Sequence, residues 1–424
     1  MAGSKPDLVV VGAGIVGLSS AYYIKKLNPD LDITVIDRAP TIAQGNTAKS
    51  AAGFRDLFTS DINFKLSNST VQFFRDVQTN QKYDLGMKFV GYLFLMGKKD
   101  RRLEYMESLS KKTGVRFYDQ KDLEDLKYMR VSPGQDNSGL MSLPDIEIAA
   151  LGQNCGIIDP DLVCNYYYEE LKKMGVNFSF NTEVLEVRLS PVNPLDYPGE
   201  PFLWQDKTIS LLRTNRGEFI ADRYLLATDV WTTALTDPLG IDSHIRPKKR
   251  QVFQVSGERV RDVVLSSPFT EEGIFPFTIL PKDGVYLRPA AKEKSFWVGV
   301  ADDIGRDFSF SETPEAEDDF YNMSLYQVAR SYFPVLEGSR VTAKWAGYYS
   351  YNTIDKTPFI FTSMNLIIAT GTSGSGILKG DGIGRYSEAV FSGREKAKMY
   401  NGAEIDTSSL GVDYRMIDKE KIIL

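Results

Sequence analysis

The chain has 424 residues, of which 42% are apolar and 25% charged, as in an ordinary soluble globular protein. It is long for one hydrophobic core, so we expect two domains, either successive or interleaved. The net charge of −6 and the lack of a long basic run give no reason to expect nucleic acid as a partner.

Cysteine and histidine usage narrows the chemistry further. Cys155 and Cys164 fit neither a metal-binding spacing nor a disulfide framework, so we expect a reducing, cytoplasmic setting. The sequence contains one histidine, His244, which rules out catalysis by two imidazoles and most zinc chemistry. We therefore expect no metal.

Two features bear on membranes. The first residues form a strand almost at once, so we do not expect a cleaved signal peptide. Apolar runs such as residues 90–96 fall far short of a membrane span. Any membrane contact is therefore expected to be peripheral, at the inner face of the cell membrane, or to run through an anchoring partner protein.

The opening stretch predicts a nucleotide-binding unit. Leu8–Val11 is an apolar run of strand length, and Gly12, Gly14 and Gly17 follow it. From Ile15 onward, apolar residues recur at helical spacing. In this strand–turn–helix context the three glycines permit a tight turn, close approach of a pyrophosphate and close helix–strand packing. The helix N-terminus then offers unpaired N–H groups to the phosphates.

An acidic residue completes the pattern. A second strand, Ile33–Ile36, ends at Asp37, which lies twenty residues after Gly17. A carboxylate there accepts ribose hydroxyls and disfavours a 2′-phosphate. A glycine turn shaped by packing alone is the alternative, but strand, glycines, helix and acid agree. The sequence therefore predicts binding of an ADP-containing dinucleotide.

The next segments are predicted in chain order. Residues 41–55 form a loop of small residues, for which a close-lying planar ligand is a good reason. Helices are expected over residues 61–77, 101–113 and 159–175, and a strand over residues 89–96. Further on, a hairpin turn is expected across residues 215–217, followed by a buried strand that starts at Tyr224.

The last part of the chain divides in two. From residue 245 to about 341 the pattern alternates in short strands, including residues 252–255, 285–288 and 296–300, which predicts a mostly antiparallel sheet. Leu366–Thr370 is again a strand, and it leads into a second glycine-rich loop and a helix. Two such loops suggest one long cofactor held at both ends.

These motifs resemble those of the D-amino-acid oxidase superfamily of FAD-dependent oxidoreductases, which includes sarcosine oxidase, glycine oxidase and flavin-linked glycerol-3-phosphate dehydrogenase. The resemblance covers nearly the whole chain. It is carried by Gly12, Gly14, Gly17 and Asp37, the loop 45–53, residues 156–160, residues 345–347 with Asp355 and Pro358, and the closing loop 371–376.

The resemblance implies an α/β fold with a Rossmann-like FAD-binding domain of the glutathione-reductase type. We expect residues 1–85, 150–244 and 341–424 to form this domain. Residues 86–149 and 245–340 would form an interleaved substrate domain with a mostly antiparallel sheet. Tethering through a cysteine after the tryptophan motif is not expected, because residues 348–352 contain none. FAD is therefore predicted to bind non-covalently.

In the family, the first loop holds the pyrophosphate, the second lies over the isoalloxazine, and the last closes near the pyrimidine end. The strand near Val184 resembles one whose backbone touches the adenine. One departure is that residues 228–231 read Thr-Asp-Val-Trp instead of Ala-Gly-Ala-Trp, which puts the charge of Asp229 near the cofactor. The predicted FAD-binding residues are Gly12, Gly14, Ile15, Val16, Gly17, Asp37, Arg38, Gly45, Asn46, Thr47, Ser50, Ala51, Ala52, Gly53, Val184, Ala227, Thr228, Trp231, Gly347, Gly371, Ser373, Gly374, Ser375, Gly376 and Ile377.

Cationic side chains are the candidates for substrate binding, because substrates in this family are typically small anions. Arg55 is the first choice, since its position resembles an active-site arginine of sarcosine oxidases and glycerol-3-phosphate dehydrogenases. Arg288, at the end of a predicted strand, is the second. Lys49, Lys379 and Arg250 are weaker candidates, and a plain surface charge is the alternative for each.

Two substrate classes compete, and the sequence narrowly favours sn-glycerol-3-phosphate, oxidised to dihydroxyacetone phosphate. Gly53-Phe54-Arg55 resembles the Gly-Leu-Arg of glycerol-3-phosphate dehydrogenases, and residues 298–303 resemble their Gly-Thr-Thr-Asp. Oxidation of an alcohol wants a general base, however, and the usual histidine has no equivalent. The alternative is an amine or amino acid such as sarcosine, proline, glycine or a D-amino acid.

The electron acceptor and the assembly state are separate expectations. We expect a dehydrogenase that passes electrons to a quinone or carrier, in preference to an oxidase. A non-catalytic FAD-binding assembly factor is a further alternative. A homodimer is allowed by the sequence but not required by it.

Overall fold

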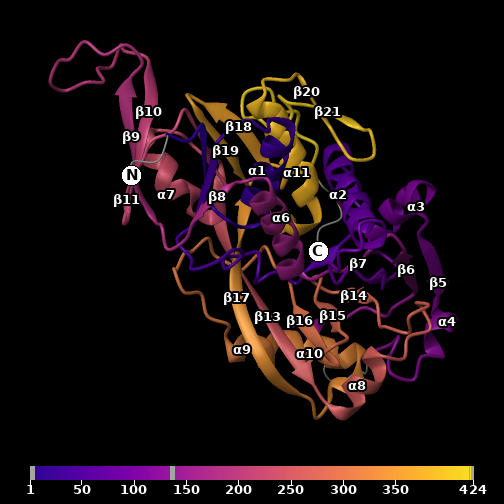
Figure 1. Ribbon diagram of the computed structural model, residues 1–424. Coiled ribbons are helices and arrows are strands. Elements are labelled where there is room, and N and C mark those ends of the chain that lie inside the picture. Colours follow the sequence, from indigo (N-terminus) through magenta and orange to yellow (C-terminus); the bar gives the residue numbers. More distant parts are fainter. Residues whose placement is uncertain (1–4, 134–138, 420, 422–424) are drawn as a thin grey trace.

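The computed structural model describes residues 5–133, 139–419 and 421. Its first layer is a six-stranded sheet in the order β18-β19-β12-β1-β2-β8 (Figure 1). These strands are Phe359–Ser363, Leu366–Thr370, Arg223–Leu226, Leu8–Val11, Ile33–Ile36 and Asn177–Ser179. All pairs are parallel except β18–β19. The predicted α/β class is confirmed.

Both faces of this sheet are covered, which explains why its strands are apolar runs without alternation. Leu8 and Val10 face the helices α1 (Ile15–Leu27), α2 (Asp61–Thr79), α6 (Pro160–Lys173) and α11 (Gly376–Phe391). Val9 and Val11 face a three-stranded sheet, β11-β10-β9. Its strands are Gly217–Phe219, Lys207–Thr214 and Val184–Pro191. In Figure 1 the β9–β10 hairpin projects away from the body.

The second layer is an eight-stranded sheet in the order β17-β13-β16-β15-β14-β4-β6-β5. The strands are Arg340–Asn352, Ile245–Ser256, Ser295–Gly299, Tyr286–Ala290, Phe277–Ile279, Tyr92–Met96, Ile148–Gly152 and Arg116–Asp119. Only β14 and β4 pair in parallel, so this sheet is mostly antiparallel, as predicted.

The structure corrects two strand lengths. The strand expected over residues 252–255 is β13, which runs for twelve residues because it pairs along its length with β17. The strand expected over residues 89–96 starts later, at Tyr92, since Gly91 adopts a positive φ of 74° that breaks the extended run. β17 falls in a segment that we assigned to the FAD-binding domain, yet it belongs to the large sheet. The domain boundaries stay a prediction.

Within the described ranges, no helix is long and apolar enough to cross a membrane.

The remaining elements are short. The further helices are α3 (Arg102–Thr113), α4 (Gln120–Glu124), α7 (Thr232–Thr236), α8 (Glu258–Val264), α9 (Asp318–Phe320) and α10 (Tyr326–Tyr332), and the further strands are β3 (Gly53–Phe54), β7 (Gly156–Ile157), β20 (Lys396–Lys398) and β21 (Glu404–Asp406).

Candidate cofactor and substrate site

A cavity of about 680 Å³ lies between the two large sheets. It begins at the carboxyl ends of β1, β2 and β12, where open α/β sheets bind ligands, and it reaches β13, β14 and β15 of the antiparallel sheet. Its volume is typical of a ligand site. Residues from the two ends of the chain meet here, as the two glycine loops predict.

The first glycine turn is shaped for close backbone approach. Gly12 has a φ of 109°, and a Cβ on it would lie 2.5 Å from the carbonyl oxygen of Ala227. A Cβ on Gly17 would collide with the carbonyl oxygen of Gly12, so Gly17 serves helix–strand packing and does not line the cavity. Asp37 accepts hydrogen bonds from the backbone N–H groups of Ala13 (2.6 Å) and Ala39 (2.8 Å), which fixes its carboxylate at the cavity wall.

The small-residue loop 41–55 forms the middle of the wall. Thr47 Oγ1 accepts from the backbone N–H of Ile15 at 3.3 Å, which ties this loop to the start of α1. Asn46 accepts from the backbone N–H of Tyr348 at 2.8 Å and donates to Asp229 at 2.6 Å. Asp229 faces the cavity, and its enclosure raises the pKa of its carboxyl group, although hydrogen bonds from Ser350 and Asn46 act in the opposite direction.

Most predicted FAD-binding residues line this one cavity. Besides Gly17, three residues of the closing loop do not. Gly371 packs on Phe359, and the hydroxyls of Ser373 and Ser375 donate to the backbone oxygens of Gly371 and Thr372. The predicted residues that line the cavity are Gly12, Gly14, Ile15, Val16, Asp37, Arg38, Gly45, Asn46, Thr47, Ser50, Ala51, Ala52, Gly53, Val184, Ala227, Thr228, Trp231, Gly347, Gly374, Gly376 and Ile377.

Aromatic side chains from the antiparallel sheet line the far end of the cavity, which we call the tyrosine end. It comprises Tyr92, Phe277, Tyr286 and Tyr349. Tyr92 and Phe277 stack at 4.2 Å between ring centroids. A Cβ on Gly53 would overlap the hydroxyl of Tyr92, and a Cβ on Gly374 would overlap the ring of Tyr349. Both predicted cofactor loops therefore abut this end.

The tyrosine hydroxyls at this end are neutral donors. Burial raises the pKa of Tyr92, Tyr286 and Tyr349 above the ordinary value of a tyrosine. Nearby cations oppose that rise: Arg55 and Arg288 at Tyr92, and Arg250 and Arg55 at Tyr349. The tyrosine end is therefore apolar, closed and electropositive.

Arg250 is the cation that lines the cavity at the tyrosine end. Its guanidinium carbon lies 4.8 Å from the ring centroid of Tyr349, and its buried Nε has no hydrogen-bond partner among the described residues. Its Nη1 donates to the backbone oxygen of Asp302 at 2.7 Å, and its Nη2 lies 3.3 Å from the carboxylate of Asp303.

Three further cations surround the two aspartates. Lys356 pairs with Asp303 and Arg306 pairs with Asp302. Lys248 donates to the backbone oxygen of Asp303. With Arg250, these are four cations around the two aspartates, and a third carboxylate, Glu317, lies 3.8 Å from Arg306.

The four predicted catalytic cations lie in different places. Arg288 donates to the backbone oxygens of Ala51, Pro289 and Ile158 and stacks on Trp297 at 4.1 Å, and burial lowers its pKa to about 10. It does not line the cavity; it fastens the loop 41–55 to the large sheet.

Arg55 and Lys379 are also buried and do not line the cavity. Both lie over the ring of Phe58, at 4.3 and 4.8 Å from its centroid. Arg55 donates to the backbone oxygen of Leu57, and Lys379 donates to Asn63. Lys49 does line the cavity, and burial together with the charge of Arg38 lowers its pKa. The roles predicted for these residues stay predictions.

Sequence reasoning did not single out Tyr92, Tyr286 and Tyr349, and it ranked Arg250 low. Each of these residues lies on a strand, and the pairing of that strand with its neighbours determines which of its side chains point toward the cavity. Arg250, for example, pairs with Gly347. The available signal was local: Tyr92 follows Gly91, and Tyr348 and Tyr349 follow the Trp-Ala-Gly motif.

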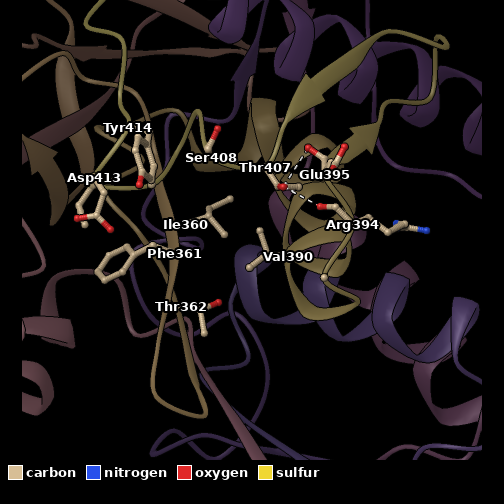
Figure 2. A pocket seen from close by; sticks show the side chains of 13 residues that line it. Ile360, Phe361, Thr362, Val390, Arg394, Glu395, Thr407, Ser408, Asp413 and Tyr414 are labelled. Atoms are coloured by element: carbon tan, nitrogen blue, oxygen red, sulfur yellow. Dashed lines mark hydrogen bonds between the residues drawn. The ribbon is translucent and has the colours of Figure 1, made fainter.

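A second cavity, of about 340 Å³, lies between β18, the end of α11 and the segments around β20 and β21 (Figure 2). Its polar groups are engaged locally: the hydroxyl of Thr407 donates to the backbone oxygens of Arg394 and Glu395. The guanidinium of Arg394 points away from it and pairs with Glu388. No chemically distinctive set of groups converges there, so the larger cavity is the candidate site.

The residues of the larger cavity fit an FAD. A glycine turn and helix N-terminus suit a pyrophosphate, Asp37 suits a ribose, and the small-residue loop leaves room for a flat ring beside the tyrosine end. Neither cysteine lies among the residues that line the cavity, and both are buried. Fold and site together define an FAD-dependent oxidoreductase.

Comparison with known proteins supports this assignment. A family model described as DAO, FAD dependent oxidoreductase, matches residues 7–388. The chain therefore belongs to the DAO family of FAD-dependent oxidoreductases, and FAD is its cofactor. The structure resembles L-proline dehydrogenase from P. horikoshii with a TM-score of 0.71 and 21% identity, covering 93% of this chain and 96% of that one. That likeness shows the fold.

Two sequence relatives extend the comparison. Glycine oxidase from Bacillus subtilis (strain 168) is 23% identical, over 88% of this chain and 89% of the oxidase. FAD-dependent oxidoreductase domain-containing protein 1 from Xenopus laevis is also 23% identical, over 90% of this chain and 78% of the relative.

Proposed function

We propose that this oxidoreductase removes a hydride from the carbon beside the nitrogen of a small amine that carries a carboxylate, such as an amino or imino acid. The observation that carries the proposal is the tyrosine end, where Arg250 and three buried tyrosines with neutral hydroxyls line the cavity. When bound, FAD supplies the hydride acceptor. The names of glycine oxidase and L-proline dehydrogenase support the same class.

Charge and hydrogen bonding would place the substrate. Arg250 would hold the carboxylate through charge-assisted hydrogen bonds, and its buried Nε is one donor for that purpose. The hydroxyls of Tyr286 and Tyr349 would donate to the same group or exclude water around it. The reacting carbon would then lie toward Gly53 and Gly374, where the cofactor loops meet this end.

An amine also suits a tyrosine end that holds neither a carboxylate nor a histidine as a general base among the described residues. The carboxylates that line the cavity lie elsewhere or have other neighbours: Asp37 lies at the glycine turn, Glu183 precedes Val184, and Asp229 accepts a hydrogen bond from Asn46. Glu312 contacts Arg38. No histidine lines the cavity among the described residues. A neutral amine can lose a hydride without a base, whereas an alcohol needs one.

The main expectation from the sequence, glycerol-3-phosphate, is not supported by these relatives and is replaced by the amine alternative. The physical reason is the placement of the cations. A phosphate dianion needs several donors, but Arg55, Arg288 and Lys379 are engaged outside the cavity. That leaves Arg250 as the lining cation at the tyrosine end, among the described residues.

Electron transfer to a quinone or carrier stays part of the proposal. We keep the expectation that a dehydrogenase passes the electrons on, and Leu378, where sarcosine oxidases carry a lysine, does not decide between a dehydrogenase and an oxidase. Reoxidation of the reduced protein separates the cases. A dehydrogenase reoxidises slowly in air and quickly with a soluble quinone, whereas rapid reoxidation in air alone would identify an oxidase.

The decisive experiment is anaerobic reduction of the purified holoprotein. Proline, glycine, sarcosine, D-amino acids and glycerol-3-phosphate are added separately while the visible flavin spectrum is recorded. We expect bleaching by at least one carboxylate-bearing amine and none by glycerol-3-phosphate. Bleaching by glycerol-3-phosphate alone would contradict the proposal. A spectrum that no compound changes would favour the assembly-factor alternative.

A further inference from the structure

A long segment without helix or strand crosses between the two sheets. Residues 301–317, which we call the strap, run from the end of β16 to the start of α9. Loops of this length without secondary structure are uncommon in compact domains and are usually functional. Ala301 and Glu312 of the strap line the cavity, so the segment forms part of its wall.

Both ends of the strap are fastened to the antiparallel sheet. At the first end, Asp303 binds Lys356 at 2.8 Å and accepts from the hydroxyl of Tyr351 at 3.0 Å. At the second end, Glu317 exchanges two hydrogen bonds with Gln251, at 2.7 and 2.6 Å. Both ends of the strap are therefore fixed to the antiparallel sheet.

The middle of the strap reaches the nucleotide-binding sheet. Glu312 pairs with Arg38 at 2.7 Å and accepts from the indole N–H of Trp231 at 3.1 Å. Arg38 in turn stacks on Trp231 at 4.2 Å. We call the contact of Glu312 with Arg38 and Trp231 the clasp. Arg38 follows Asp37 and Trp231 follows β12, so the clasp lies over the part of the cavity suited to the dinucleotide.

Neighbouring contacts seat the clasp. Phe310 lies against the rings of Trp231 and Tyr348, at 5.8 and 5.4 Å. The backbone N–H of Ser311 donates to the hydroxyl of Tyr348 at 2.8 Å. The clasp itself is exposed, with 39% of the Arg38 side chain and 58% of the Glu312 side chain accessible to solvent. An ion pair so exposed is individually weak and is screened by salt, which suits a closure that must open.

We propose that the strap is a gate over the FAD cavity and that Glu312, through Arg38 and Trp231, slows the release of FAD. The strap must leave these partners for the dinucleotide to enter or depart past the first glycine turn. Glu312 is a positioning residue that touches no reacting atom. The inference needs the cofactor but not the proposed amine substrate.

The test measures the rate at which FAD leaves the holoprotein. Holoprotein is diluted to nanomolar concentration, and the fluorescence of released FAD is followed over time. We expect Glu312→Gln to speed release about threefold, the factor for losing one solvent-exposed ion pair. Raising the salt concentration should speed release from the natural protein but not from this variant.

Glu315→Gln is the matched control, because it removes the same charge from the strap at a residue with no hydrogen bond or ion pair in the described structure. It should release FAD at the natural rate. The exchanged pair Arg38→Glu with Glu312→Arg should restore slow release in part. Equal release by Glu312→Gln and the natural protein would overturn the gate. So would a Glu312→Gln apoprotein whose thermal midpoint falls as its holoprotein's does, because that pattern indicates a structural role.

Discussion

The two ends of the cavity are built in different ways. The dinucleotide end consists of three loops that each follow a strand, and its contacts are largely backbone groups and small residues. The tyrosine end consists of side chains from strands far apart in sequence, such as Tyr92, Arg250 and Tyr349. We therefore expect backbone geometry to position the cofactor and side-chain chemistry to select the substrate. Substitutions at the dinucleotide end should therefore lower the FAD content, whereas substitutions at the tyrosine end should lower the rate with the substrate.

The largest effect is expected at the first glycine turn. Gly12→Ala forces a Cβ into a positive φ and to within 2.5 Å of the Ala227 carbonyl oxygen. Such strain costs about 1–3 kcal/mol before the clash is counted. We expect protein purified with little or no FAD, measured by the ratio of flavin to protein absorbance. Gly175→Ala is the control and should keep its FAD, since Gly175 also has a positive φ, 79°, but its Cβ would meet nothing within 4 Å and it does not line the cavity. Full FAD content in Gly12→Ala would contradict this account of the turn.

The tyrosine end should show the opposite pattern. Arg250→Leu is expected to keep its FAD but to lower kcat/KM for the best amine substrate about 100-fold, because a buried charged contact is lost. Steady-state kinetics and the flavin spectrum measure the two quantities. Lys344→Gln removes an equal charge from the neighbouring strand β17 outside the cavity, and it should leave both unchanged. An Arg250→Leu enzyme that retains its natural kcat/KM would assign the substrate contact to another residue.

A smaller effect is expected at Asp229, between the two ends. Its folded pKa is raised, so the folded apoprotein binds its proton more tightly than the unfolded chain does. The free energy of unfolding should therefore fall as pH rises from the ordinary value of 3.8 toward the raised pKa. The loss is about 1.4 kcal/mol per unit by which the pKa is raised.

Asp229→Asn should make this slope shallower, as measured by denaturant unfolding of the apoprotein between pH 4 and pH 7; the remaining slope comes from buried carboxyl groups such as Asp56 and Asp381, whose pKa is also raised. Asp237→Asn, at an exposed position in a nearby turn, is the control and should keep the natural slope. The same slope in Asp229→Asn as in the natural protein would show that the Asp229 carboxylate is not penalised by its enclosure.

The same contrast explains what could be predicted from the sequence. β1, β2 and β19 have the predicted bounds because each is an apolar run that ends at a glycine or, in β2, at Asp37. The charge of Asp229 near the cofactor loops was also foreseen, because the departure lies inside a recognisable motif. These features depend on neighbours in the chain.

The tyrosine end could not be predicted in the same way. The first half of β13 is polar, with Lys248, Lys249 and Arg250, and it is a strand because β17 pairs with it and the strap's carboxylates neutralise it. Arg288 lies in the middle of β15 and not, as the sequence led us to expect, at the end of a strand. Backbone carbonyl groups more than a hundred residues away in the chain engage its guanidinium. Such long-range partners leave no local signal.

The most direct test of the central claim, that Arg250 binds a substrate carboxylate, compares an acid with its amide. The rate of anaerobic flavin reduction is measured for the best amine substrate and for its carboxamide, in the natural enzyme and in Arg250→Leu. We predict that the natural enzyme prefers the acid about 100-fold and that the variant loses most of this preference. The same acid-to-amide ratio in both enzymes would contradict the account.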